Sequence, residues 1–205
     1  MYTENTMRNL FVLLVVSACA CGLAFAQSGE ISVSGGTTRF TGHYTTGDFV
    51  GGSSSVPVDF TSGFRLAFRF TWNQGKLFSH EIGYGYSRSH LKYKSSPEQD
   101  ITPMSMHQGL YDFLLNATPE GSRIRPFACG GVQFTSFYPP GASVYGGSIT
   151  KFGINYGAGI KVKLNSIWGI RADFRQYAMG KPDFGLGSSG WMRMTEATAG
   201  VVFMF

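Results

Sequence analysis

Apolar and polar residues alternate with a period of two along several stretches of the chain, most clearly between Phe152 and Leu164. There every second residue is apolar, and the residues in between are glycine, asparagine or lysine. Successive side chains of a β-strand point to opposite faces of the strand. The pattern therefore predicts a strand with one apolar face and one polar face.

The same alternation recurs along the chain. Around Trp168 one face is apolar, while the other carries Arg171, Asp173 and Arg175. The pairs Gly35-Gly36 and Gly130-Gly131 interrupt the alternation, which indicates bulges or close packing. In total the sequence predicts eight strands, at about Gly29–Arg39, Val58–Trp72, Leu77–Leu91, Met104–Ala117, Arg123–Phe137, Lys151–Leu164, Ile167–Tyr177 and Trp191–Phe205.

The connections between these strands alternate in length. The short ones are Asn73–Lys76, Thr118–Ser122 and Asn165-Ser166. The long ones are Thr41–Pro57, Lys92–Pro103, Tyr138–Thr150 and Ala178–Gly190. A soluble sandwich or a lipocalin-type barrel also has alternating strands, with the apolar faces turned inward, but neither requires such regular loops. Short turns at one end and long loops at the other are typical of transmembrane barrels. We therefore predict an all-β, eight-stranded antiparallel up-and-down transmembrane barrel with apolar faces toward lipid.

The first 26 residues have the order of a signal peptide. A basic residue, Arg8, precedes an apolar run, and a small-x-small site ends at Ala26. The predicted domains are a signal peptide over residues 1–26 and a barrel over residues 27–205. Two alternatives are a membrane anchor, for which the apolar run is short, and a lipoprotein signal at Cys19. Met7 is an alternative start.

Composition narrows the possible functions. The net charge is +5, and the basic residues are spread along the chain, so nucleic-acid binding has no support. Only Cys129 remains after the leader, which excludes a disulfide within the predicted mature chain. No metal, phosphate or nucleotide motif is present, so we expect no cofactor.

The last strand ends on aromatic residues. Its final positions, Thr198, Gly200, Phe203 and Phe205, look like the C-terminal assembly signal of outer-membrane barrels. With this signal the chain resembles the small OmpA-type and OmpX-type eight-stranded barrels, also called opacity-type proteins. The resemblance implies a monomer in the bacterial outer membrane, surrounded by its lipid and inserted by the barrel-assembly machinery with periplasmic chaperones. Because the sequence stops at Phe205, we expect none of the peptidoglycan-binding domain of full-length OmpA.

The polar faces of the strands predict a charged lumen. At eight strands a barrel interior is just filled by side chains, and an isolated buried charge is costly, so these charges must pair. We expect the arginines to pair with the three acidic residues, and Lys161 and Lys163 to lie near a wet end. The predicted lumen network comprises Arg65, Arg69, Glu81, Arg171, Asp173, Arg175 and Glu196.

Function is less constrained by the sequence than fold. Some similar barrels modify lipid A, and the lipid A deacylases among them use a His-x-Ser pair, but none of His43, His80, His90 and His107 is followed by serine at that spacing. We therefore predict a non-enzymatic barrel with a structural or surface-interaction role through its long loops. The alternatives are a narrow pore for ions or small solutes and a lipid A-modifying enzyme.

Overall fold

The computed structural model describes residues 29–42, 44–45, 57–93, 99–138, 147–182 and 190–205, and every regular element in these ranges is a β-strand. In these ranges no helix has the length and apolar character needed to cross a membrane. The strands are β1 Gly29–Thr41, β2 Tyr44–Thr45, β3 Pro57–Phe60, β4 Gly63–Gln74, β5 Phe78–Tyr93, β6 Gln99–Asn116, β7 Ile124–Tyr138, β8 Ile149–Lys163, β9 Trp168–Gly180 and β10 Trp191–Met204.

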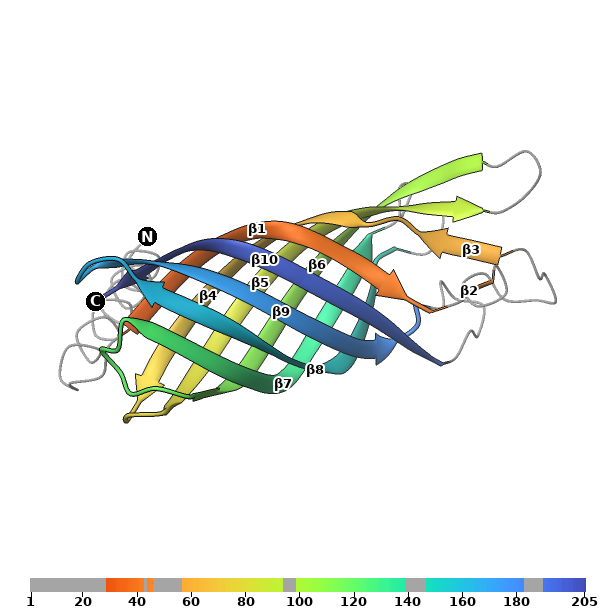
Figure 1. The fold of residues 1–205 in the computed structure, drawn as a ribbon. Helices are drawn as coiled ribbons and strands as arrows, with labels where there is room; N and C mark the ends of the chain where they lie inside the picture. Colours follow the sequence, from red (N-terminus) through yellow and green to blue (C-terminus); the bar gives the residue numbers. More distant parts are fainter. Residues whose placement is uncertain (1–28, 43, 46–56, 94–98, 139–146, 183–189) are drawn as a thin grey trace, which may run out of the picture.

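Eight of these strands close into an antiparallel barrel. Each of β4 to β9 pairs with the next strand along the chain, and β1 pairs with both β4 and β10, so the barrel closes. The strands are tilted against the long axis, as Figure 1 shows. The fold predicted from the alternation and the loop lengths is confirmed.

The barrel wall is apolar outside and polar inside. In β4, Phe68 and Phe70 are 46% and 42% exposed, whereas Arg69 between them is 3% exposed. This is the reverse of a soluble protein, in which large apolar side chains fill the core. The outer wall is thus built to contact lipid and the inner wall to contact other side chains.

The predicted strand Val58–Trp72 is in fact two strands. It is interrupted at Thr61-Ser62, and β3 pairs with β5 and β2, while β4 pairs with β5 and β1. Phe60 lies four residues before the outward-facing Phe64, so an uninterrupted strand would turn Phe60 toward lipid, but it is buried in the lumen, 4.4 Å from Phe40 between ring centroids. The two-residue interruption changes the alternation between Phe60 and Phe64.

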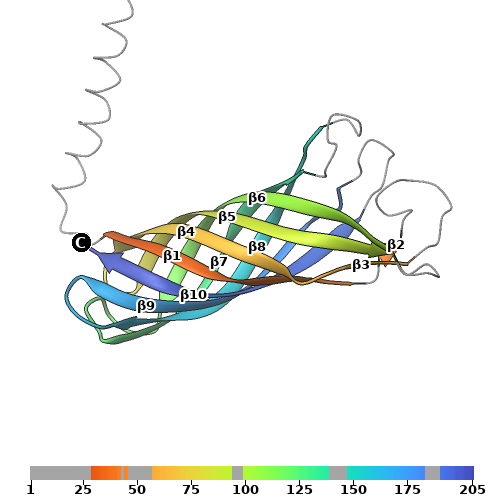
Figure 2. The same cartoon turned by 90° about the horizontal axis from the view of Figure 1, so that it is seen from above.

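The loop predicted at Lys92–Pro103 is also shorter than expected. Strands β5 and β6 continue as a paired ribbon to Tyr93 and from Gln99, with a register shift between Leu91 and Lys92. Hydrogen bonds between the two strands pair the backbone polar groups of this segment. Most of its residues are polar, so the sequence shows no alternation of apolar residues from which the strands could be predicted. With β2 and β3 the ribbon extends the sheet beyond the barrel at the long-loop end (Figure 2).

The glycine pairs mark close packing rather than bulges. The pairing of β1 with β10 runs without a shift through Gly35 and Gly36. A Cβ atom on Gly36 would lie 2.0 Å from the carbonyl oxygen of Ala197, so a side chain there would collide with the neighbouring backbone. The same holds for Gly131, whose Cβ would lie 2.0 Å from the carbonyl oxygen of Tyr111.

Candidate functional site

The lumen is the main concentration of charged side chains in the described residues, and it is arranged in layers along the barrel axis. Going along β9 from the short-turn end, the inward residues are Arg171, Asp173, Arg175, Tyr177 and Met179. The charged residues therefore occupy the middle of the barrel, and apolar ones follow toward the long loops. We call these the central layer and the outer layer, and the group near the short turns the mouth layer.

Four arginines and four carboxylates make up the central layer. Arg171 binds two of the acids: its Nη1 lies 2.6 Å from Glu81 Oε2, and its Nε lies 2.8 Å from Asp173 Oδ2. Arg175 pairs with Glu81 at 2.6 Å, with Asp173 at 3.1 Å and with Asp112. Each arginine therefore bridges carboxylates from different strands, and these contacts tie β5, β6 and β9 together across the lumen.

The other half of the central layer is built around Glu196 on β10. This carboxylate pairs with Arg65, whose Nε lies 2.8 Å from Oε2, and with Arg69. The hydroxyl of Tyr177 donates to Glu196 Oε2 at 2.8 Å, and Arg65 donates to Ser87 Oγ at 2.9 Å. Since the positive and negative charges are equal in number and buried, their pairing offsets much of the cost of removing them from water.

The structure brings all seven residues of the predicted lumen network, Arg65, Arg69, Glu81, Arg171, Asp173, Arg175 and Glu196, into this layer. It adds Asp112, which sequence reasoning missed. Asp112 lies between Tyr111 and Phe113, whose side chains face outward, and this local alternation was the available signal. Lys161 and Lys163, expected near a wet end, both line the pocket at the short-turn end, although Lys161 itself is only 5% exposed.

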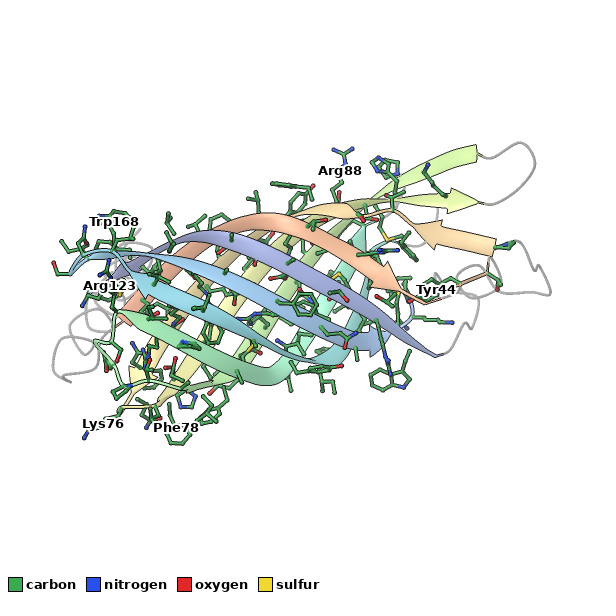
Figure 3. The ribbon with its side chains drawn as sticks, viewed as in Figure 1. Tyr44, Lys76, Phe78, Arg88, Arg123 and Trp168 are labelled. Atoms are coloured by element: carbon green, nitrogen blue, oxygen red, sulfur yellow. The ribbon has the colours of Figure 1, made fainter. Side chains whose placement is uncertain are left out.

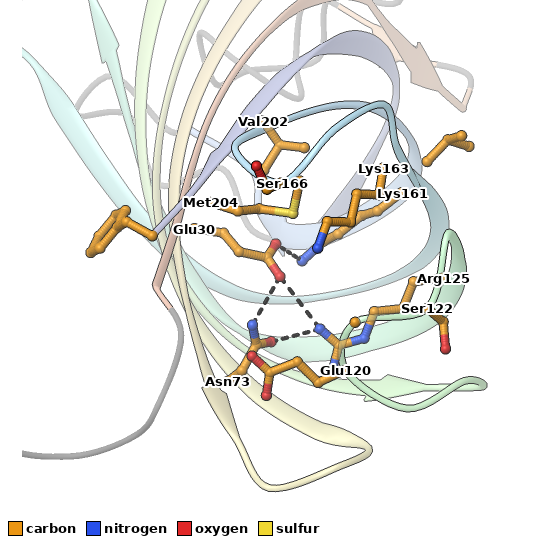
Figure 4. Close-up of a pocket in the computed structure, with 13 residues that line it drawn as sticks. Glu30, Asn73, Glu120, Ser122, Arg125, Lys161, Lys163, Ser166, Val202 and Met204 are labelled. Carbon is orange, nitrogen blue, oxygen red and sulfur yellow. Dashed lines mark hydrogen bonds and ion pairs between the residues drawn. The ribbon is translucent and has the colours of Figure 1, made fainter.

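The mouth layer holds a second, smaller cluster around Glu30 (Figure 4). Glu30 accepts hydrogen bonds from Asn73 Nδ2 at 2.9 Å, from Arg125 Nη1 at 3.4 Å and from Lys161. Glu30 and Arg125 were not predicted as part of a cluster. Sequence reasoning put both within strands but drew no conclusion about their faces.

A pocket of about 180 Å³ opens beside this cluster at the short-turn end, and Glu120 and Lys163 line it. Partial burial raises the pKa of the Glu120 carboxyl above its ordinary value. The pocket does not continue into the central layer, because Phe127 lies between them. Its ring centroid is 5.5 Å from Lys161 Nζ, in the mouth layer, and 5.0 Å from Arg171 Cζ, in the central layer. The ring therefore contacts one cation from each of the two layers.

Above the central layer the lumen is mainly apolar. The side chains of Phe137, Met179 and Met192 are completely buried, and the ring of Phe60 packs on Phe40. The outer layer comprises Phe40, Tyr44, Phe60, Met104, Met106, Leu110, Phe137, Tyr177, Met179, Met192 and Met194. Buried polar side chains lie beside this layer, since Arg65 donates to Gln108, and Gln108 donates to Gln133 and Thr135. Large apolar side chains nevertheless fill most of this part of the lumen.

The described histidines do not form a hydrolase-like pair. His43 lies outside the described residues. His80 and His107 face outward, and their ring nitrogens contact the hydroxyls of Tyr111 at 2.7 Å and Tyr84 at 2.5 Å. No described histidine ring has a serine hydroxyl as hydrogen-bond partner, and the described residues contain no group of three His, Cys, Asp or Glu side chains able to hold a metal.

The end of the chain lies at the short-turn end of the barrel. Gly29 and Phe205 exchange two backbone hydrogen bonds of 2.9 and 3.0 Å. The Phe203 ring lies 5.3 Å from Trp168 and 5.9 Å from Phe205, while Thr198 is buried in the lumen. The recognition of these residues by an assembly machinery stays a prediction.

Comparison with known proteins agrees with this architecture. The model of the family described as outer membrane protein beta-barrel domain matches residues 11–205. None of the curated proteins matches the sequence significantly.

Several solved structures share the fold at low identity. OprG from Pseudomonas aeruginosa is 11% identical, with a TM-score of 0.64 over 88% of this chain and 96% of OprG. Neisserial surface protein A is 13% identical, with a TM-score of 0.56 over 87% of this chain and 97% of its own. Ail of Yersinia pestis, solved with the heparin analogue sucrose octasulfate, is 12% identical, with a TM-score of 0.50 over 86% and 99%. At such identities the likeness shows the fold alone.

Proposed function

The chain belongs to the outer membrane protein β-barrel family, and we propose that it is a closed, non-conducting and non-enzymatic barrel whose working surface is its outer end. Its place is the bacterial outer membrane, as the sequence predicted. In such barrels the short turns face the periplasm and the long loops face outward. The layers described above therefore run from the periplasmic mouth to the outer apolar layer.

The filled lumen is the observation that carries the proposal. A conducting barrel needs a continuous hydrated path, and two layers of different chemistry interrupt it here. In the central layer each arginine is engaged by carboxylates from other strands. In the outer layer methionine and phenylalanine side chains with at most 1% exposure, such as Met104 and Phe137, close the same cross-section. A defect in one layer leaves the other in place.

The outer end offers the larger surface for contact with other molecules. There β2, β3 and the ends of β5 and β6 carry the sheet past the barrel (Figure 2). A rigid scaffold that displays loops and strand ends is a common platform for binding. This arrangement supports a surface-interaction role better than a role at the mouth, where the pocket is small and is lined by no residue of the central layer.

Recording from purified protein in planar lipid bilayers tests the closed lumen. We expect no unitary current steps from the wild-type chain, under conditions in which a general porin gives them. Arg171→Ala should also remain silent, because the outer apolar layer stays intact. Steps in the wild type whose size changes in Arg69→Ala or Arg171→Ala would show that the lumen conducts, and would overturn the proposal.

Binding by whole cells tests the working surface. Ail was solved with a heparin analogue, so immobilised heparin is the first probe, followed by a panel of matrix proteins. Cells displaying the wild type should bind one of these probes, and replacement of Lys92–Asp100 by Asn-Gly should reduce that binding. Lys76→Gln, at the periplasmic end, is the matched control. Equal binding by cells with and without the protein across the panel would count against a surface role.

A further inference from the structure

The outer wall of the barrel carries very few charged side chains, and they are all of one sign. Between the periplasmic turns and the register shift at Leu91, the outward-facing charged side chains that the structure describes are Arg39, Arg88 and Arg193. The acidic side chains described in the same strands face the lumen: Glu30, Glu81, Asp112, Asp173 and Glu196. The charge of the wall toward the membrane is therefore wholly positive.

The three arginines lie close together on one side of the barrel. Arg193 is opposite Thr41 of β1, two residues beyond Arg39, so the two arginines are diagonal neighbours. Along the other side of β1, Thr37 is opposite Phe64, and Phe64 is opposite Arg88. Arg88 is thus two strands away from Arg39, a backbone separation on the order of 10 Å. We call this sector over β10, β1, β4 and β5 the basic band.

The basic band lies at the height of the outer headgroup region. Arg39 is eight residues from Ile31, an outward residue near the periplasmic end of β1. At about 3.3 Å per residue and a tilt near 40°, this is roughly 20 Å along the membrane normal, close to the height of a barrel's apolar belt. Phe64 and Val201 belong to that belt. Figure 3 shows Arg88 pointing away from the barrel wall.

No described side chain neutralises the band. None of the three arginines has an ion pair or a side-chain hydrogen bond among the described residues. If these arginines served only to extend their charged ends to the interface between lipid and water, we would expect such arginines all around the barrel. Instead, the other four strands, β6 to β9, carry neutral outward residues toward the long-loop end, namely Ser105, which lies directly opposite Arg88, and Ser136, Thr150 and Gln176. One-sided, unpaired positive charge is the arrangement expected of a binding surface for an anionic headgroup.

We propose that the basic band binds the phosphorylated glucosamine headgroup of lipid A, the anionic glycolipid of the outer leaflet, with its acyl chains lying on the apolar wall below. Arginine suits this role, because its guanidinium matches phosphate with paired N–H donors and stays charged at any physiological pH. Two phosphates on one disaccharide match a set of cations spread over three strand spacings, from β10 to β5, better than they match a single residue.

Native mass spectrometry tests the proposal on the full barrel in detergent micelles containing bisphosphorylated lipid A. We expect the wild type to retain lipid A. The triple variant Arg39→Gln, Arg88→Gln, Arg193→Gln should bind lipid A with an apparent affinity about tenfold lower, because a loss of this size is about the effect of one charge-assisted hydrogen-bonded contact. The matched control is Lys76→Gln with Arg123→Gln, which removes charge at the opposite end (Figure 3) and should leave retention unchanged. Heat-modifiable gel migration verifies that each variant is folded.

The lipid itself provides the second arm. Dephosphorylated lipid A should bind the wild type as weakly as intact lipid A binds the triple variant, and millimolar free phosphate should displace little, because it lacks the acyl chains. If the triple variant does not fold, the three single variants each replace it, with a smaller loss expected. Equal retention by wild type and variants, or equal binding of dephosphorylated lipid A, would overturn the proposal and leave the closed lumen unaffected.

Discussion

The central and outer layers of the lumen fill the same cross-section of the same barrel by opposite means. In the central layer, side chains are fixed mainly by directional contacts, as Arg171 is by Glu81 and Asp173. In the outer layer, side chains such as Met179 and Phe137 touch apolar neighbours and make no comparable directional bonds. The comparison shows that a narrow barrel can be closed either by electrostatic complementarity or by volume alone.

The two layers should differ in what they tolerate. A buried ion-pair cluster depends on the identity of each member, because removing one charge leaves its partners unpaired in a medium of low dielectric constant. A packed apolar layer depends mainly on total volume, because methionine adapts its shape and similar hydrophobic residues replace one another at small cost. Substitutions in the two layers therefore separate these two modes of closure.

Glu81→Ala should have the largest effect. It removes the carboxylate that pairs with Arg171 and Arg175, each at 2.6 Å, and accepts from Thr71 at 2.8 Å. We expect a loss of about 3–5 kcal/mol in the free energy of unfolding. Urea unfolding in lipid vesicles measures it. Glu120→Gln, in a periplasmic turn, is the control and should change stability by less than about 0.5 kcal/mol. A loss for Glu81→Ala as small as that would contradict the account of the central layer.

The same contrast explains which parts of the molecule could be predicted. In β4, β8 and β9 the lumen face is charged or small and the lipid face is apolar, so period-two alternation identified both faces and most of the network. In β6 both faces are largely apolar: Met104, Met106 and Leu110 face inward, while Tyr111 and Phe113 face outward. Alternation disappears where the lumen itself is apolar, and the outer layer was therefore not anticipated.

The partners within the network were not predictable in detail for a different reason. Alternation places Arg175 on a face, but its contact with Asp112 depends on how four strands, β6 to β9, are staggered against one another. The stagger is set by backbone pairing and by close approaches such as that at Gly131. No single strand contains that information. The interruption at Thr61-Ser62 is similar, since β3 is held by pairing with β5 rather than by its own pattern.

Met179→Ala and Met179→Leu form the smaller and more discriminating test, because Met179 is completely buried in the outer layer. The alanine variant leaves a cavity and should lose about 2–3 kcal/mol, whereas the leucine variant keeps nearly the same volume and should lose less than about 1.5 kcal/mol. Urea unfolding in the same vesicles measures both. Equal losses for alanine and leucine would mean that the thioether makes a specific contact, and closure by volume alone would then be wrong for this layer. A small loss for leucine, beside the large loss for Glu81→Ala, would establish that the barrel is closed by position-specific charge in its middle and by interchangeable apolar volume toward its outer end.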